Sequence, residues 1–246
     1  MMQRAHRIGI NILATLATLA IFGLDQAPGA DEERFEISSI KAVRPTLVDT
    51  ITALQQRDIT RAKAAFQAYD SGWNGIEVYV NTRSKDMYRL LELEFQPRII
   101  KALERVNPDI PALLADVQAM LVKFDEAVST FAKASPLNPL YDEVARLRIV
   151  RAHLREVAPA LRAGDTAKAR KSFEAFEDGW FNIEDFVRSR SLDAYVAIET
   201  GMVQIEQALL MPDQPDLATV TGLVSDVMNQ YNAVVTAVQK EARSAQ

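Results

Sequence analysis

The sequence contains no cysteine and only two histidines, His6 and His153. The lack of cysteine excludes disulfides, thiolate metal sites, iron–sulfur clusters and cysteine nucleophiles. Ferritin-like di-iron sites need Glu-x-x-His pairs, and the chain has none. The net charge of −5 includes no block of basic residues, so we expect no nucleic-acid partner. With no phosphate-binding loop and no nucleophile beside a base, we expect the protein not to be an enzyme.

The first 30 residues have the pattern of an export signal. Arg4 and Arg7 precede an uncharged apolar run over 8–24, and small residues follow up to Ala30. The run is close to the shortest length that spans a bilayer. Residues 1–30 are therefore predicted to be a signal peptide, or an N-terminal membrane anchor formed by residues 8–24. Export of a cysteine-free, mildly acidic chain predicts a periplasmic location.

Two segments of the remaining chain resemble each other. The motif Gly-Trp-x-x-Ile-Glu occurs at 72–77 and again 107 positions later at 179–184. The correspondence runs without a gap between 58–109 and 165–216, and it includes both tryptophans of the chain. Repetition at a fixed period indicates a tandem duplication. Each copy has about 100 residues, which is enough to bury a core of its own.

Apolar residues recur at helical spacing through both copies, and no stretch shows sustained strand alternation. Asp58 and Ser84 are the residue types that cap helix N-termini, and Asp165 and Ser191 repeat them in the second copy. We therefore expect helices to begin directly after these four residues. Residues 31–41 are polar and are predicted to be a loose lead-in.

The fold prediction is an all-α protein of two tandem antiparallel four-helix bundles related by internal duplication. The first bundle is assigned to residues 31–134 and the second to residues 142–246. Residues 135–141 contain the one proline-rich break between the copies and are predicted to be the linker.

In each copy, two glutamates are expected to face each other. In the first copy they lie at equal distances before and after the turn near residue 84, and equal distance from the turn means equal height in an antiparallel helix pair. A tyrosine lies one helical turn before the second glutamate, on the same side of its helix. Facing carboxylates inside a bundle commonly hold a hard cation. The predicted metal ligands are Glu77, Glu92 and Tyr88, with Glu184, Glu199 and Tyr195 as their counterparts.

The same acids also have a structural interpretation. Two close carboxylates in a low-dielectric interior cannot both ionise without cost, so they could share a proton or bond the tyrosine. They could also pair with Arg83 and Arg190, which both copies retain. A satisfied network requires arginine beside the acids, whereas a metal site requires oxygen atoms that are not already occupied.

Gly72 and Gly179 lie within expected helices, where glycine costs about 1 kcal/mol relative to alanine. We expect close approach of a neighbouring helix at these positions. A local helix opening near a ligand is the alternative.

The second copy resembles the extracytoplasmic helical domain of bacterial high-affinity iron/lead permeases. The similarity is carried by Gly-Trp-x-x-Ile-Glu, a basic residue after it, Ser-x-Asp-x-Tyr and Ile-Glu, and residues 176–188 with 194–199 are the closer copy. The first copy departs from this pattern at Asn81 and Leu91. A weaker similarity reaches imelysin-like iron-uptake proteins, but Asn74 and Phe181 stand where that family has a metal-binding histidine.

The resemblance implies a periplasmic protein associated with iron uptake, with an iron ion as the bound cation. The permease family's membrane helices and their Arg-Glu-x-x-Glu motifs are missing, so the chain would serve a separate membrane permease or another membrane complex. The alternative function is a metal-free helical scaffold subunit of an extracytoplasmic membrane complex.

Overall fold

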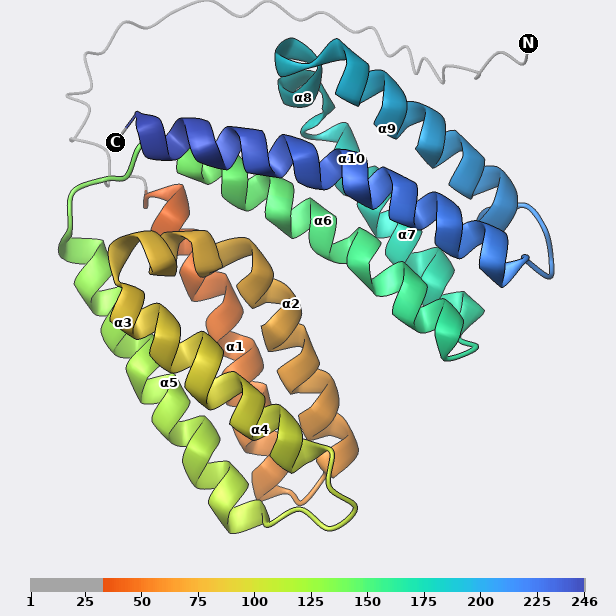
Figure 1. Ribbon diagram of the computed structural model, residues 1–246. Coiled ribbons are helices and arrows are strands. Elements are labelled where there is room, and N and C mark those ends of the chain that lie inside the picture. The colour runs from red at the N-terminus through yellow and green to blue at the C-terminus, as the bar shows by residue number, and fades with distance from the viewer. Residues whose placement is uncertain (1–32, 246) are drawn as a thin grey trace, which may run out of the picture. The chain divides into compact units, whose positions relative to one another are not determined.

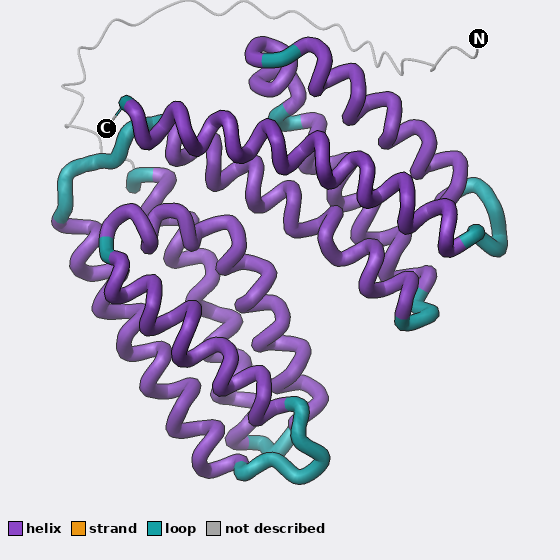
Figure 2. The backbone as a smooth tube through the Cα atoms, in the orientation of Figure 1, coloured by secondary structure: helices purple, strands orange, loops and turns teal. Residues whose placement is uncertain are grey.

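Helices account for nearly all of residues 33–245, the part of the chain described in this computed structural model, and no strand occurs in that part (Figure 2). The all-α prediction is therefore confirmed. The predicted signal peptide or anchor at 1–30 lies outside the described residues. Within residues 33–245, no helix is both long enough and apolar enough to cross a membrane.

The first half, residues 33–134, consists of helices in which α1 packs along both α2 and α5, and the segment from α3 to α4 contacts α2 and α5 (Figure 1). Between α3 and α4 the chain forms one π-helical segment, η1. The elements are α1 (Phe35–Gln55), α2 (Ile59–Arg83), α3 (Lys85–Tyr88), η1 (Arg89–Phe95), α4 (Gln96–Leu103) and α5 (Ile110–Lys133).

The second half, residues 135–245, has a similar order of helices. α6 packs along α7 and α10, and α9 contacts α8 and α10 (Figure 1). The elements are α6 (Leu140–Arg162), α7 (Thr166–Phe181), α8 (Glu184–Arg190), α9 (Leu192–Ile205), η2 (Glu206–Leu210) and α10 (Leu217–Ser244).

The expected caps begin equivalent helices in the two halves. The Asp58 side chain accepts a hydrogen bond from the Arg61 backbone N–H at 2.9 Å, and Asp165 does the same for Lys168 at 2.9 Å. Ser84 and Ser191 likewise cap α3 and α9 through their side-chain oxygens. Each cap satisfies a backbone donor that a helix N-terminus leaves unpaired, so these predicted starts are confirmed.

The two repeated glycines lie where neighbouring helices approach closely. A Cβ atom on Gly72 would lie 3.1 Å from a Val43 methyl group of α1, and one on Gly179 would lie 2.9 Å from a Val150 methyl group of α6. Val150 follows Val43 by the same 107 positions. The prediction of close helix approach is therefore confirmed, and the repeated pattern extends to the first helix of each half.

Matched aromatic pairs occupy the two cores. Tyr69 of α2 meets Phe124 of α5 edge to face, with ring centroids 6.3 Å apart. The equivalent residues Phe176 and Tyr231 meet in the same manner at 5.7 Å. Such edge-to-face contacts add to the stability gained by burying the rings.

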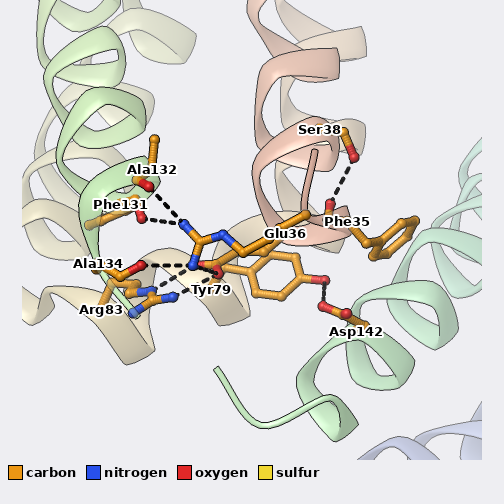
Figure 3. Close-up of polar contacts among 10 residues, drawn as sticks. Phe35, Glu36, Ser38, Tyr79, Arg83, Phe131, Ala132, Ala134 and Asp142 are labelled. Carbon is orange, nitrogen blue, oxygen red and sulfur yellow. Dashed lines mark hydrogen bonds and ion pairs between the residues drawn. The ribbon is translucent and has the colours of Figure 1, made fainter. Parts of the chain in front are cut away.

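The start of α1 differs from the expected loose lead-in at 31–41, because α1 begins at Phe35. Glu36 is only 3% exposed and accepts two hydrogen bonds from Arg83, both 2.7 Å (Figure 3). Arg34 donates to backbone carbonyls at the end of α5, including Phe131 at 2.7 Å. These polar residues are therefore ordered by long-range contacts, which a local reading of their polarity could not reveal.

Contacts between α2 and α6 join the two halves. A Cβ atom on Gly75 would lie 2.4 Å from the Ile149 side chain, so the missing side chain allows the two helices to pack closely. Tyr79 of α2 donates a 2.7 Å hydrogen bond to Asp142 of α6 (Figure 3). This packing places the glutamate-bearing face of α2 beside the arginines of α6.

Candidate functional site

The six predicted ligands lie around the turn between the second and third helical segments of each half. In the first half, Glu77 belongs to α2, Tyr88 ends α3 and Glu92 lies in the π-helix η1. A π-helical turn shifts side chains relative to a regular helix and often occurs at functional sites. In the second half, Glu184 begins α8, and Tyr195 and Glu199 lie on α9.

The stretch that carries the first glutamate differs between the halves. In the first half, α2 continues without a break through Glu77 to Arg83. In the second half, α7 ends at Phe181, and Glu184 begins the separate helix α8 after the Ile183 N-cap position. The same repeated motif therefore lies inside one helix in the first half and spans a break between two helices in the second half.

In the first half, the two carboxyl groups lie close enough to influence each other. Burial raises the pKa of Glu92, and the negative charge of Glu77 raises it further. Burial also raises the pKa of the Tyr88 hydroxyl, with smaller contributions from Glu77 and Glu92. The structure thus brings together the three residues that the sequence predicted to converge.

Glu77 is already held by an arginine from the other half. Arg148 Nη1 of α6 lies 2.5 Å from Glu77 Oε1, and both side chains are largely buried. Arg148 Nη2 also donates to Gln239 Oε1 of α10 at 3.1 Å. A guanidinium group therefore occupies the position at Glu77 where a cation would bind.

Glu92 is less completely satisfied than Glu77. The Glu92 Oε2 atom is buried and has no hydrogen-bond partner among residues 33–245. The nearby Trp73 indole N–H lowers the pKa of Glu92, yet it makes no hydrogen bond of normal geometry. Trp73 and Glu92 are therefore neighbours without a hydrogen bond.

In the second half, Glu184 and Glu199 also lie together. Burial is the largest cause that raises the pKa of Glu184, followed by the negative charge of Glu199. The charge of Glu199 is the largest cause that raises the pKa of Tyr195, followed by burial and by Glu184. The three predicted ligands of this half therefore also converge.

An indole holds one of these carboxylates in place. Trp180 Nε1 donates a 2.5 Å hydrogen bond to Glu199 Oε1. The Trp180 ring also stacks on the Tyr195 ring, with centroids 6.2 Å apart and planes 20° apart. Trp180 thus positions two predicted ligands: it bonds Glu199 and stacks on Tyr195.

No guanidinium group holds Glu184 or Glu199 within the described part of the chain. The nearby Arg188 donates to Asp185 at 2.6 Å, and Arg190 lies 3.5 Å from Glu241. The network interpretation placed Arg83 and Arg190 beside the paired glutamates, but Arg83 bonds Glu36. Both repeated arginines therefore pair with acids outside the predicted sites, Glu36 and Glu241.

The sequence prediction missed Arg148, which decides the state of the first pair. The residue that corresponds to Arg148 in the first half is Lys41, 107 positions earlier, which pairs with Glu33. The repeat therefore gave no indication that Arg148 bonds Glu77. Arg148 also lies 71 positions from Glu77. The only sequence signal was the helical spacing of Arg148, Arg151 and Arg155, which indicates a basic face on α6.

No group of three or more acidic or histidine side chains suited to a metal ion forms within residues 33–245. Each predicted site instead combines two carboxylates with one tyrosine hydroxyl. No family model, curated protein or solved structure matches the chain.

Proposed function

We propose that this protein is a periplasmic, iron-uptake-associated protein that binds an iron-like cation and serves a separate membrane permease. Glu184, Glu199 and Tyr195 are the ligands in this proposal. The observation that supports it most directly is that these two close carboxylates have no arginine partner among the described residues. Oxygen donors without a bound cationic side chain are the arrangement that a hard cation requires.

The proposal includes the architecture that the duplication suggests, namely two tandem antiparallel four-helix bundles. Its support is the repetition of individual contacts at the same period: the aspartate caps, the glycine–valine approach and the aromatic pairs. The helices before and after the repeated turn would then hold the two glutamates of each bundle at the same height.

Glu77, Glu92 and Tyr88 form the weaker site in this proposal. A cation there would have to displace Arg148 from Glu77, and breaking a largely buried ion pair costs free energy. We therefore expect the second half to bind the cation first and the first half to bind it weakly.

Titration of metal-free full chain with ferrous iron under anaerobic conditions tests the proposal. The double variant Glu184→Gln/Glu199→Gln should lose affinity by at least about tenfold, because it removes both charged ligands. Glu174→Gln/Asp213→Asn provides a control with the same loss of charge at exposed positions, and its affinity should be unchanged. Unchanged stoichiometry and affinity in the first variant would reject these ligands.

A metal-free scaffold subunit is the second candidate, and two observations favour it. The Glu77–Arg148 ion pair ties α2 to α6 in the manner of a structural contact. On α9, Leu192, Val196 and Val203 are spaced to share one helix face and are 62%, 51% and 47% exposed. An exposed apolar stripe of this kind is typical of a protein interaction surface. In this case metal chelators should leave the thermal stability unchanged, whereas Glu77→Gln should lower it.

A further inference from the structure

A polar cavity of about 700 Å³ lies beside Glu77, on the side of the α2–α6 contact that faces α3 and α10. Its size falls within the usual range for small-molecule sites. Four of its lining residues are charged, namely Glu77, Lys85, Arg148 and Arg243. The cavity therefore carries a net charge of +2 when these side chains are ionised.

The charges in the cavity are unevenly compensated. Arg148 is neutralised by Glu77, the only acid among the lining residues that the structure describes. Lys85 and Arg243 make no ion pair with another residue in the described range 33–245. They come from α3 and α10 and face the same space from two sides. An anion bound between two such cations gains electrostatic attraction from both, which offsets their mutual repulsion.

The remaining lining provides hydrogen-bonding groups that suit such an anion. Asn81 and Thr82 of α2 offer an amide and a hydroxyl, and Gln239 of α10 offers another amide. Amide and hydroxyl donors commonly accompany arginine and lysine around carboxylate and phosphate oxygens. The lining is mostly polar, which favours a small and strongly hydrated ligand over a hydrophobic one.

We propose that this cavity binds a small dianion, either a dicarboxylate or a phosphate compound, between Lys85 and Arg243. Arg148 lines the wall of the cavity while it remains paired with Glu77, so the net positive charge comes from Lys85 and Arg243. The site shares Glu77 and Tyr88 with the weaker cation site of the first half and is separate from the proposed cation ligands of the second half. Its occupant is recognised by charge and by oxygen geometry.

Isothermal titration of the full chain tests this proposal, with succinate and inorganic phosphate as the probes. The protein is first freed of metal on a chelating resin, so that any metal site contributes nothing. The double variant Lys85→Gln/Arg243→Gln should weaken binding by at least tenfold. Both side chains are exposed, so the variant should fold normally, and its thermal unfolding checks this.

Arg162→Gln/Lys171→Gln is the matched control, because it removes two exposed positive charges that lie outside the cavity. Its affinity should stay within twofold of the parent protein. Binding of succinate alone would assign a dicarboxylate, and binding of phosphate alone would assign a phosphate compound. Binding of neither probe at millimolar concentration would overturn the proposal. Equal weakening in the control would also overturn it, because this would show general charge attraction.

Discussion

The two glutamate pairs of this protein have the same residues and different surroundings. In the first half, Arg148 bonds Glu77, while Trp73 and Glu92 lie side by side without a hydrogen bond. In the second half, no arginine bonds either glutamate within residues 33–245, and Trp180 donates to Glu199. The two halves therefore share these side chains, but their neighbours differ, and only the second pair has no arginine partner among the described residues.

The repeated arginines give the clearest separation between the halves. Arg83 forms two 2.7 Å hydrogen bonds with Glu36, and these side chains are only 10% and 4% exposed. Arg190 lies 3.5 Å from Glu241, and both of those side chains are substantially exposed. Removing one partner of a buried pair leaves an uncompensated charge, whereas exposed pairs contribute little.

We expect Arg83→Ala to lower the free energy of unfolding by about 3 kcal/mol and Arg190→Ala by less than about 0.5 kcal/mol. Urea unfolding of the two variants measures the difference. Equal destabilisation would show that the two arginines have equivalent roles despite their different burial.

The first glutamate of each pair should show the next largest difference. Glu77→Gln would leave Arg148 without its carboxylate in a largely buried position, at a cost of about 2 kcal/mol. Glu184→Gln removes no ion pair with another described residue, and we expect a change below about 0.5 kcal/mol. Thermal unfolding of both variants in the absence of metal provides the comparison. A larger loss for Glu184→Gln would contradict the assignment of Glu77 as the structurally bonded member.

The tryptophans test the second carboxylate of each pair. Phenylalanine at either position removes a similar volume, but only Trp180→Phe removes a hydrogen bond, the one to Glu199. Hydrogen bonds to charged groups are worth about 1.5–3 kcal/mol, so Trp180→Phe should cost about 1.5 kcal/mol more than Trp73→Phe. Matched urea unfolding curves measure this difference. Equal costs would mean that the Trp180 hydrogen bond adds no net stability.

Local features of this fold were predictable from the sequence because they depend on nearby residues. The caps at Asp58, Ser84, Asp165 and Ser191 each bond a backbone N–H three residues later, so residue type and position were sufficient. The convergence of the paired glutamates was also predictable, because it follows from counting residues on each side of one turn.

Long-range partners were not predictable in the same way. Glu36 looked like part of a solvated lead-in, yet its contact with Arg83 spans 47 positions. Arg148 reaches Glu77 only because α2 packs on α6, a contact between the halves that no repeated residue indicates. The π-helix that carries Glu92 has no counterpart at 196–202 in the second half, so the repeat itself could not indicate it.

The smallest expected effect is the pH dependence of stability that arises from Glu92 and Glu184, one member of each pair. Both have a pKa raised chiefly by burial and next by the paired glutamate. A raised pKa means that the folded state binds more protons than the unfolded state between the ordinary glutamate value of about 4.3 and the raised value. Stability should therefore fall as the pH rises through this window.

Glu92→Gln should remove more of this pH dependence than Glu184→Gln, because Glu92 has a fully buried carboxylate oxygen. Urea midpoints measured from about pH 4 to pH 8 would show a flatter profile for Glu92→Gln. If stability instead rose through the window in the parent protein, the folded state would favour the ionised glutamates. A bound cation also favours ionised carboxylates, so adding ferrous iron should weaken the fall of the parent protein's stability with rising pH. Glu184→Gln should abolish this effect of iron more completely than Glu92→Gln.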